Sequence, residues 1–383
     1  MLDAGAPIPV LLPPNMLRKV NVGIVGCGNI SDAYFIGSKK FDILNLVACA
    51  DLDPARAKAK AAQYGIRACA SVADLLHDPE VEIVINLTVP KAHAEVNTAA
   101  LHAGKHAYCE KPFALTSADG AAVLELAKSK HLLVGSAPDT FLGAGIQTAR
   151  KAVDDGAIGR PVSALAFMMC RGHESWHPSP QFYYQRGGGP MFDMGPYYVT
   201  ALVNLFGPVS RVAGSTSAAF SERLITSQPL NGTLMPVETP THLTGTMDFA
   251  GGGTGTLVMS FDTWPYPLPF IVLFGTDGTL EVPDPNHFTG AVRLRSKDGT
   301  TYEEIPHAHL AERSRGVGVA DMAYSILRRD RPARASGELA EHVVEIMESF
   351  EKSSVTGRHV TLKTSCARPA ALPGNLGSNE LDA

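Results

Sequence analysis

Residues 20–32, with the sequence VNVGIVGCGNISD, constrain the fold of this chain more than any other stretch. An apolar run at residues 22–25 leads into a tight turn between Gly26 and Gly28, and an apolar-spaced segment follows. This order predicts a buried strand, a glycine turn and the start of a helix, a layout that receives a dinucleotide pyrophosphate. Ser31 replaces the third glycine of the usual fingerprint, so the motif alone is also compatible with an ordinary strand–helix turn.

A second predicted strand, within residues 42–53, ends in acidic residues. Asp51 follows Gly26 at about the distance expected for the carboxylate that binds the adenosine ribose. A carboxylate there accepts hydrogen bonds from both ribose hydroxyls and repels a 2′-phosphate, which favours NAD over NADP. Asp51 or Asp53 could instead cap the helix that begins at Pro54.

Predicted strands alternate with predicted helices up to about residue 135. The β-branched run at residues 81–89 is typical of a parallel strand buried on both faces. The alternation predicts a doubly wound parallel sheet, whose ligands bind beyond the carboxyl ends of the strands. The residues that we therefore expect around the cofactor are Gly26, Gly28, Asn29, Ile30, Asp51, Thr88, Pro90, His93, Glu110 and Lys111.

From residue 161 onward, valine- and threonine-rich segments alternate with a period of two and are separated by Gly/Asp turns. This pattern predicts a largely antiparallel sheet, covered by a helix near residues 143–153 and by another that contains residues 196–206. The two halves of the chain therefore belong to different fold classes, a parallel α/β half and an α+β half.

Composition excludes several classes of function. The net charge of −5 argues against a nucleic-acid surface, and no apolar run is long enough to span a membrane. The six cysteines form no CxxC pair, and no cluster has the spacing of metal ligands. The N-terminus has no basic region ahead of its short apolar run, so we expect no signal peptide and a cytoplasmic protein.

Three stretches together resemble the Gfo/Idh/MocA oxidoreductases, which are sugar and polyol dehydrogenases. They are VGIVGCGNIS at 22–31, AGKHAYCEKP at 103–112 and GGGPMFDMGPYY at 187–198. The resemblance implies a Rossmann domain that binds NAD, followed by a domain with a large open, mostly antiparallel sheet, often used for dimer or tetramer contacts. The predicted organisation is a flexible extension at 1–17, a Rossmann domain at 18–140, a substrate-binding and oligomerisation domain at 141–362 and a flexible tail at 363–383.

The resemblance also implies a catalytic group, because the lysine of the Glu-Lys-Pro motif, here Lys111, usually acts on the substrate. An amine at a strand end could hydrogen-bond the hydroxyl being oxidised, and we expect partial burial to lower its pKa. Pairing with Glu110 is the structural alternative. The family motif Asp-x-Gly-x-His keeps Asp193 here but has Tyr197 in place of the histidine. Tyr197 either shares the proton transfer or lines the pocket while Tyr198 or a histidine supplies the proton shuttle.

Two segments are candidates for binding substrate. Asp139 lies in a segment whose residues differ from those that many relatives carry there. It could hold sugar hydroxyls or cap the following helix. Residues 171–178, RGHESWHP, combine aromatic rings that stack on sugars with groups that bind hydroxyl or anionic substituents. We expect substrate contacts from this second segment, and Arg315 could also reach the pocket. The candidates in the second segment are Arg171, His173, Trp176 and His177.

Three hypotheses follow for a protein whose partner is a small sugar or glycoside. The first is an NAD-dependent oxidoreductase that acts on a secondary hydroxyl, with Lys111, Asp193 and Tyr197 as its catalytic residues. The second is an NAD-dependent glycoside hydrolase that oxidises its sugar transiently, eliminates the anomeric substituent, adds water and returns the hydride. An anionic sugar, for example a sulfonated one, is conceivable there because of Arg171 and the histidines. The third is a dinucleotide sensor without catalysis. We expect a homodimer or homotetramer.

Overall fold

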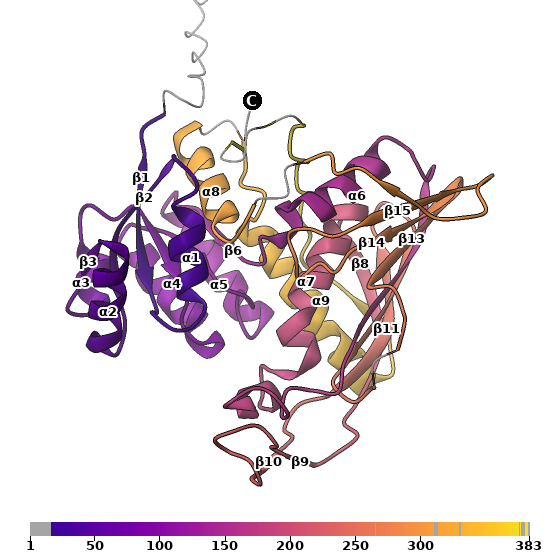
Figure 1. Cartoon of the computed structure of the whole chain (residues 1–383), viewed down its shortest axis with the longest axis horizontal. Helices are drawn as coiled ribbons and strands as arrows, with labels where there is room; N and C mark the ends of the chain where they lie inside the picture. Colours follow the sequence, from indigo (N-terminus) through magenta and orange to yellow (C-terminus); the bar gives the residue numbers. More distant parts are fainter. Residues whose placement is uncertain are drawn as a thin grey trace, which may run out of the picture.

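The computed structural model describes residues 17–264, 266–309, 313–328, 331–374, 376 and 380–381. Figure 1 shows two parts next to each other, a sheet flanked by helices and a broad sheet with helices on the face toward the first part. The predicted N-terminal extension lies outside the described residues, apart from Leu17.

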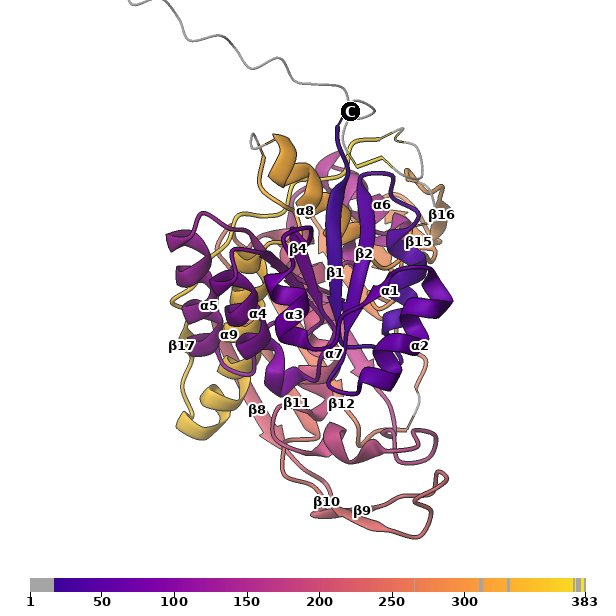
Figure 2. The ribbon, with the colours of Figure 1, turned by 90° about the vertical axis from the view of Figure 1, so that its left-hand side faces the viewer.

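The N-terminal part is built on a six-stranded parallel sheet with the order β3-β2-β1-β4-β5-β6. Its strands are β1 (Val20–Val25), β2 (Leu44–Ala50), β3 (Arg67–Ala68), β4 (Ile83–Asn86), β5 (His106–Cys109) and β6 (Val134–Ser136). Its helices are α1 (Ser31–Ser38), α2 (Pro54–Tyr64), α3 (Val72–His77), α4 (His93–His102) and α5 (Ser117–Ser129). Figure 2 looks onto this part, with β1, β2 and β4 at its centre. The doubly wound parallel sheet is confirmed, and β3 is a short edge strand that the sequence pattern did not predict.

The position of the predicted cofactor edge follows from the strand order. The chain leaves β1 toward β2 on one side and later returns to place β4 on the other side of β1. The carboxyl ends of β1 and β4 therefore flank the point at which the strand order reverses, where doubly wound sheets bind their ligands. Apart from Asn21 and Asn86, both strands consist of buried aliphatic residues and glycine, as expected for a sheet covered by helices on both faces.

The C-terminal part is built on a nine-stranded sheet with the order β16-β15-β14-β13-β7-β12-β11-β8-β17. Its strands are β7 (Pro161–Met169), β8 (Val209–Ser217), β11 (His242–Phe249), β12 (Thr254–Ser260), β13 (Ile271–Gly275), β14 (Gly278–Val282), β15 (Val292–Ser296), β16 (Glu303–Ile305) and β17 (Val360–Thr361). Strands β7 and β12 pair in parallel, and the other neighbours in this sheet are antiparallel. The prediction of a mostly antiparallel sheet is confirmed. A separate hairpin of β9 (Glu222–Leu224) and β10 (Leu234–Pro236) projects beyond the sheet (Figure 1).

Three helices lie between the two sheets and cover one face of the larger one (Figure 1). They are α6 (Ala144–Asp154), α7 (Gly189–Phe206) and α9 (Gly337–Thr356). Helix α7 packs on β7, β11 and β12, whereas α9 packs on β8 and also contacts α5 of the Rossmann part. The first residues of α7 therefore lie close to the carboxyl ends of the parallel strands.

The predicted boundaries of the second domain need a correction. Helix α8 (Val317–Arg328) lies within the range 141–362, but it packs against α1 and β6 of the Rossmann part. The approach is close, because a Cβ on Gly37 of α1 would stand 1.9 Å from the carbonyl oxygen of Arg315, and one on Gly318 would stand 2.2 Å from Tyr108 Oη. The chain thus returns to the first domain after it has completed most of the second.

The prediction of a flexible tail is wrong for residues 363–374. The guanidinium of Arg368 donates hydrogen bonds to the carbonyl oxygens of Asn204 and Leu205 at the end of α7. The Leu372 amide donates to the Gln147 side chain of α6, and the Leu372 side chain is buried. The segment is held by hydrogen bonds of its backbone and of Arg368. Such bonds leave no apolar period in the sequence, so a sequence pattern did not predict them.

Within the described ranges, no helix is long and apolar enough to cross a membrane. Among the same residues, no three His, Cys, Asp or Glu side chains gather in a way that could hold a metal ion.

Candidate functional site

The glycine turn after β1 has the conformation that its sequence predicts. Gly26 has a φ of 99°, and a Cβ there would stand 2.7 Å from the carbonyl oxygen of Leu87. Only glycine fits this position without strain. By contrast, a Cβ on Gly28 would meet no atom within 4 Å, so the space beside this backbone is open. Ser31 is buried and donates its hydroxyl proton to the Gly28 carbonyl, which shows how serine closes the turn in place of the third glycine.

The start of α1 is also open, because Ile30 at its N-cap supplies no side-chain hydrogen bond. The exposed residues Asn29 and Ile30 border this helix end. Backbone N–H groups at such a helix end attract the phosphates of a dinucleotide. The turn and the helix start together fit the pyrophosphate of NAD.

The two aspartates after β2 have separate roles. Asp53 caps α2, because its carboxylate accepts a hydrogen bond of 3.0 Å from the amide of Ala55. The Asp51 carboxylate instead accepts hydrogen bonds from the amides of Cys27, at 2.7 Å, and Asp53, at 2.8 Å. Asp51 therefore lies against the glycine turn, where a carboxylate fits the adenosine ribose of NAD.

The loop after β4 carries three predicted cofactor residues. Thr88 is partly exposed and hydrogen-bonds Asn86, and Pro90 opens a short helical turn. His93 is fully buried, and its ring nitrogens lie 2.6 Å from the Pro112 carbonyl oxygen and 3.0 Å from that of Thr88. Burial lowers the pKa of His93 despite these contacts. The predicted cofactor contact of the His93 side chain is corrected, since the side chain is buried and both ring nitrogens contact loop carbonyl oxygens.

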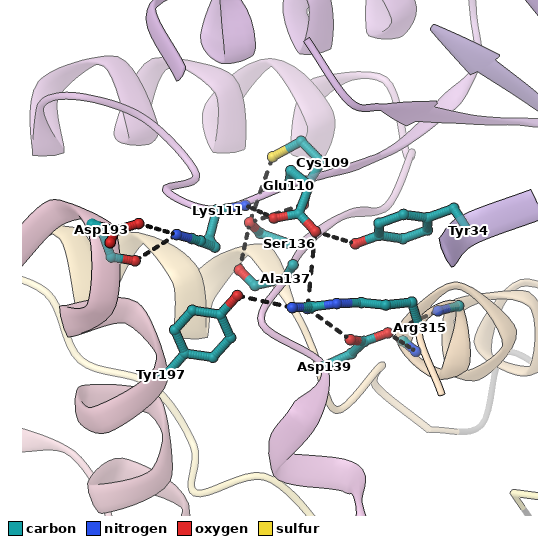
Figure 3. A network of polar contacts seen from close by, with 12 residues as sticks. Tyr34, Cys109, Glu110, Lys111, Ser136, Ala137, Asp139, Asp193, Tyr197 and Arg315 are labelled. Atoms are coloured by element: carbon teal, nitrogen blue, oxygen red, sulfur yellow. Dashed lines mark hydrogen bonds and ion pairs between the residues drawn. The ribbon is translucent and has the colours of Figure 1, made fainter. Parts of the chain in front are cut away.

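An arginine lies at the centre of a buried group of polar side chains, drawn in Figure 3. We call Arg315, Asp139, Glu110 and Tyr197 the arginine cluster. The Arg315 guanidinium lies 3.3 Å from Asp139 Oδ1 and 3.9 Å from Glu110 Oε1. It also donates a hydrogen bond of 2.8 Å to the phenol oxygen of Tyr197. The cluster joins the Rossmann strand ends, the segment before α8 and helix α7.

The acidic members of the arginine cluster have no carboxylate oxygen free. Asp139 is completely buried, and its Oδ2 accepts hydrogen bonds from the amides of Gly316 and Gly318 at the start of α8. Both predictions for Asp139 are therefore wrong, because it neither faces a substrate nor caps α6. Glu110 accepts hydrogen bonds from the Tyr34 hydroxyl and the Lys111 amide. Burial alone raises the pKa of Glu110, but the charges of Arg315 and Lys111 lower it overall. The predicted cofactor contact of Glu110 is corrected to this structural role.

A second group of charged residues lies beside the first. We call Lys111, Asp193 and His173 the lysine cluster. Lys111 follows β5, and its ammonium donates a hydrogen bond of 2.9 Å to Asp193 Oδ1 and another to the Asp193 carbonyl oxygen (Figure 3). His173 Nε2 lies 3.2 Å from the other carboxylate oxygen, Asp193 Oδ2. The three side chains are 16%, 17% and 13% exposed, in that order of residues. Thus Lys111 pairs with Asp193, and the alternative pairing of its side chain with Glu110 is not observed.

The charges of Lys111 and Asp193 stabilise each other. Burial lowers the pKa of Lys111, but Asp193, Tyr197 and Glu110 together outweigh burial and raise this pKa well above its ordinary value. The expectation of a lowered pKa is therefore wrong. Burial raises the pKa of Asp193, but the Lys111 charge and the contact with His173 lower it to about 2. Both groups keep their charge across the neutral pH range.

Tyr197, a member of the arginine cluster, also contacts the lysine cluster through its ring. Its ring lies under the Lys111 ammonium, with 5.2 Å from Nζ to the ring centroid, while its hydroxyl lies on Arg315. The neighbouring Tyr198 is 1% exposed, and this burial raises its pKa above the ordinary value of a tyrosine. This burial removes Tyr198 from the set of possible proton shuttles.

The loop after β7 brings three of the predicted substrate residues together. Trp176 is 61% exposed, and its ring meets those of His173 and His177 edge to face at 5.1 and 5.4 Å. Arg171 lies apart from them, with its guanidinium over the rings of Phe220 and Trp264. The loop thus presents an exposed indole next to a histidine that contacts Asp193.

One residue that holds this loop carries no signal in the sequence. Arg223 in β9 has only 3% of its side chain exposed and donates hydrogen bonds to Glu174 Oε1 and to the carbonyl oxygen of Arg171. It also pairs with Asp262, and Glu174 accepts a further hydrogen bond from the Tyr184 hydroxyl. An isolated arginine in a short hairpin strand cannot be assigned such a role from spacing alone.

The parallel sheet with its glycine turn and adjoining carboxylate is the architecture of a dinucleotide-binding Rossmann fold, and comparisons with known proteins agree. Residues 20–137 match the model of the oxidoreductase family with an NAD-binding Rossmann fold, GFO_IDH_MocA, and residues 146–281 match the GFO/IDH/MocA C-terminal domain. The chain belongs to the Gfo/Idh/MocA family.

Similar proteins include several sugar enzymes. Levoglucosan dehydrogenase of Pseudarthrobacter phenanthrenivorans is 25% identical over 266 residues, which are 63% of this chain and 67% of that protein. Inositol 2-dehydrogenase of Salmonella typhimurium is 35% identical over 147 residues, 37% of this chain and 44% of that protein. The 1,5-anhydro-D-fructose reductase of Ensifer adhaerens is 32% identical over 146 residues, 38% of this chain and 44% of that protein. The chain thus spans about half the length, or less, of several curated relatives.

Solved structures share the whole fold. A levoglucosan dehydrogenase in complex with NADH and L-sorbose matches 91% of this chain and 100% of its own, with a TM-score of 0.79 and 20% identity. An aldose–aldose oxidoreductase from Caulobacter crescentus matches 90% of this chain and 100% of its own, with a TM-score of 0.75 and 23% identity. At this identity the likeness shows the two-domain fold, and the chemistry of this chain rests on its own side chains.

Proposed function

We propose that this protein is an NAD-dependent oxidoreductase that acts on a secondary hydroxyl of a sugar or glycoside. The observation that carries the proposal is the position of Lys111. Its ammonium lies at the carboxyl end of β5, in the sheet edge that carries the glycine turn, and Asp193 keeps it charged. Relatives named for levoglucosan, inositol and anhydrofructose support a cyclic polyhydroxylated substrate.

The cofactor site is formed by backbone and one carboxylate. Gly26, Gly28 and the start of α1 hold the pyrophosphate, and Asp51 binds the adenosine ribose. NAD⁺, when bound, supplies the acceptor for the hydride that leaves the carbinol carbon. Thr88 and Pro90, on the loop after β4, border the nicotinamide half.

Lys111 acts on the reacting oxygen as a hydrogen-bond donor. A group that stays protonated cannot take a proton at neutral pH, but it stabilises the negative charge that develops on the hydroxyl oxygen. Asp193 orients the ammonium, and the Tyr197 ring lies beneath it. We assign Tyr197 to positioning, since its hydroxyl is occupied by Arg315. The exposed Trp176 offers a face for the sugar ring.

The redox-type glycoside hydrolase is the second candidate. It needs acid and base groups at more than one carbon of the sugar. His173 and His177 favour the hydrolase, because both histidines lie on the loop after β7. His173 of this loop contacts Asp193, and the ring of His177 contacts Tyr183. Glu174 does not serve as a further acid or base, since Arg223 and Tyr184 donate hydrogen bonds to its carboxylate.

One set of assays separates the candidates. The protein is incubated with NAD⁺ and levoglucosan, myo-inositol or D-glucose, with NADH and 1,5-anhydro-D-fructose, and with 4-nitrophenyl glycosides. We expect NADH to change in stoichiometry with one of the free sugars. Release of 4-nitrophenol without net NADH would replace this function by the hydrolase. Binding of NADH without turnover of any compound would support the sensor.

We propose that a second copy of the chain packs against the face of the nine-stranded sheet that α6, α7 and α9 leave uncovered. Register pairs Leu165 with Thr256 and Val272, and Phe167 with Val258, so these side chains share a face of β7, β12 and β13. Leu165, Phe167 and Val258 keep part of their surface exposed there. Light scattering is expected to give twice or four times the mass of one chain, and a monomer at micromolar concentration would contradict this assignment.

A further inference from the structure

We propose that His173 is the proton acceptor of this site and takes over the role that the family motif gives to the histidine replaced by Tyr197. The inference rests on the proposed function. It concerns a residue outside the motif, which reaches Asp193 from the loop after β7.

The hydrogen-bond geometry defines a carboxylate–histidine dyad. Asp193 Oδ1 accepts from Lys111, and Asp193 Oδ2 lies 3.2 Å from His173 Nε2. An ionised carboxylate only accepts hydrogen bonds, so it holds the imidazole proton on Nε2. Nδ1 then carries the lone pair, and this atom is buried with no hydrogen-bond partner among the described residues. A buried nitrogen without a partner is costly, and a substrate hydroxyl that reaches His173 Nδ1 would supply the missing partner.

The loop holds His173 in place before any substrate binds. The backbone N–H of His173 donates to the Tyr184 hydroxyl, which in turn bonds Glu174. The buried Arg223 ties Glu174 to Asp262 and to the carbonyl oxygen of Arg171. The rings of Tyr183, Phe261 and Trp176 pack against the imidazole. A reactive group held by such a network loses little freedom in the transition state.

The other charged and titratable groups around His173 are poorly suited to accept the substrate proton, so His173 is assigned as the base. Lys111 stays protonated and Asp193, with a pKa of about 2, stays ionised. Burial, together with the Asp193 charge, raises the pKa of Tyr183 to about 12. Glu174 is bound by Arg223, and Tyr197 by Arg315. His177 lies on the same loop, but its Nδ1 accepts from the Ser179 amide. Histidine is the side chain that ordinarily exchanges protons near neutral pH.

The step balances without a further reactant. The carbinol C–H bond breaks, and its two electrons and hydrogen are transferred to NAD⁺ as hydride. The O–H bond breaks, its proton moves to His173 Nδ1, and its electron pair completes the C=O bond. The imidazolium that forms faces the Asp193 carboxylate and then releases its proton to water. Lys111 donates a hydrogen bond to the oxygen throughout.

The first test compares two histidine substitutions across pH, with the sugar that the wild type turns over. His173→Gln keeps an N–H for Asp193 but cannot take a proton. We expect its kcat to fall at least 100-fold with NADH affinity unchanged, and the dependence of kcat on pH to differ from that of the wild type. Imidazole added to His173→Ala should restore part of the rate. His77→Gln, the control at an exposed histidine on α3, keeps the wild-type kcat and pH dependence. A His173→Gln variant with wild-type kcat and an intact pH profile would overturn the proposal.

The second test does not depend on turnover. In protein labelled with ¹⁵N-histidine, the His173 signal, assigned with His173→Gln, should show a proton on Nε2 and none on Nδ1 at pH 8. The opposite tautomer would overturn the dyad. If the wild type oxidises none of the sugars, the proposed function fails, and the NMR result still decides the state of His173. If the wild type is active and His173→Gln equals it, only this inference fails.

Discussion

The lysine cluster and the arginine cluster contain similar residues but have opposite designs. In the arginine cluster, every carboxylate oxygen has a donor, and Asp139 is completely buried. In the lysine cluster, one carboxylate carries two cationic or donor groups, and His173 Nδ1 has no partner within the described chain. A fully satisfied cluster holds elements together, whereas a cluster with an unused atom keeps capacity for a ligand.

The comparison also separates the elements that each cluster joins. The arginine cluster links the ends of β5 and β6, the start of α8 and helix α7, so it connects parts distant in sequence. The lysine cluster links the same β5 end and the same helix to the loop after β7, which bears the exposed Trp176. Removing one residue from each cluster should therefore affect different quantities, stability in one and turnover in the other.

The largest effect is expected for Lys111→Met. Loss of the donor to the developing alkoxide should lower kcat about 10³-fold, which is about 4 kcal/mol of transition-state stabilisation. The dissociation constant of NADH, measured by protein fluorescence, should change less than threefold. The control is Lys128→Met, because Lys128 is exposed on α5, where it pairs with Glu125 three residues earlier. A Lys111→Met variant with unaltered kcat would remove the lysine cluster from the chemistry.

Arg315→Met should act mainly on stability. It leaves Asp139 and Glu110 as buried carboxylates without their cation, and breaking a buried pair in this way costs about 3 kcal/mol. Denaturation in guanidinium chloride measures the change. Arg293→Met is the matched control, since Arg293 is exposed and lies 3.7 Å from Glu281, and it should cost less than about 1 kcal/mol. Equal losses in both variants would contradict the assigned role of the arginine cluster.

Acid should weaken the lysine cluster in a defined range. The folded pKa of Asp193 is about 2, below the ordinary value of about 3.9 for an aspartate in an unfolded chain. The ionised carboxylate therefore stabilises the fold above the unfolded pKa, and this contribution is lost as pH falls through the folded pKa. About 2 kcal/mol should disappear between pH 5 and pH 2. In Asp193→Asn, the unfolding free energy should lack this component, and identical acid profiles for both proteins would refute it.

Tyr197→Phe should have the smallest effect. It tests whether the Tyr197 hydroxyl serves stability or proton transfer. If the hydroxyl serves only Arg315, its loss costs about 1 kcal/mol of stability and changes kcat less than about fivefold. A 100-fold fall in kcat without loss of stability would instead place the hydroxyl in the proton transfer. Unfolding and steady-state kinetics of the same preparation give both numbers. Tyr266→Phe, on a side chain 70% exposed, is the control.

Much of this site could be predicted from local patterns. The glycine turn, Asp51 and Lys111 lie directly after strands that the apolar segments predict, so strand order brings them to one edge. Asp193 and Tyr197 lie four residues apart on α7 and share a helix face. His173, Trp176 and His177 were predicted for the substrate pocket from their residue types.

Other features depend on contacts between distant segments, which no local pattern encodes. Asp139 meets Arg315 and the start of α8 more than 170 residues later in the chain, and this contact buries it. Arg223 holds the His173 loop from a separate hairpin, and residues 363–374 pack through backbone hydrogen bonds that have no sequence period.

The sequence by itself determined the parallel sheet, the NAD-binding edge and the position of Lys111, because these follow from hydrophobic periodicity and from turns that only glycine can make. Only the tertiary structure decided the charge state of Lys111, the burial of Asp139 and the contact between His173 and Asp193. The physical reason is that pKa values and hydrogen-bond partners depend on the distance and desolvation of charges. Folding sets both quantities across segments that lie far apart in the chain.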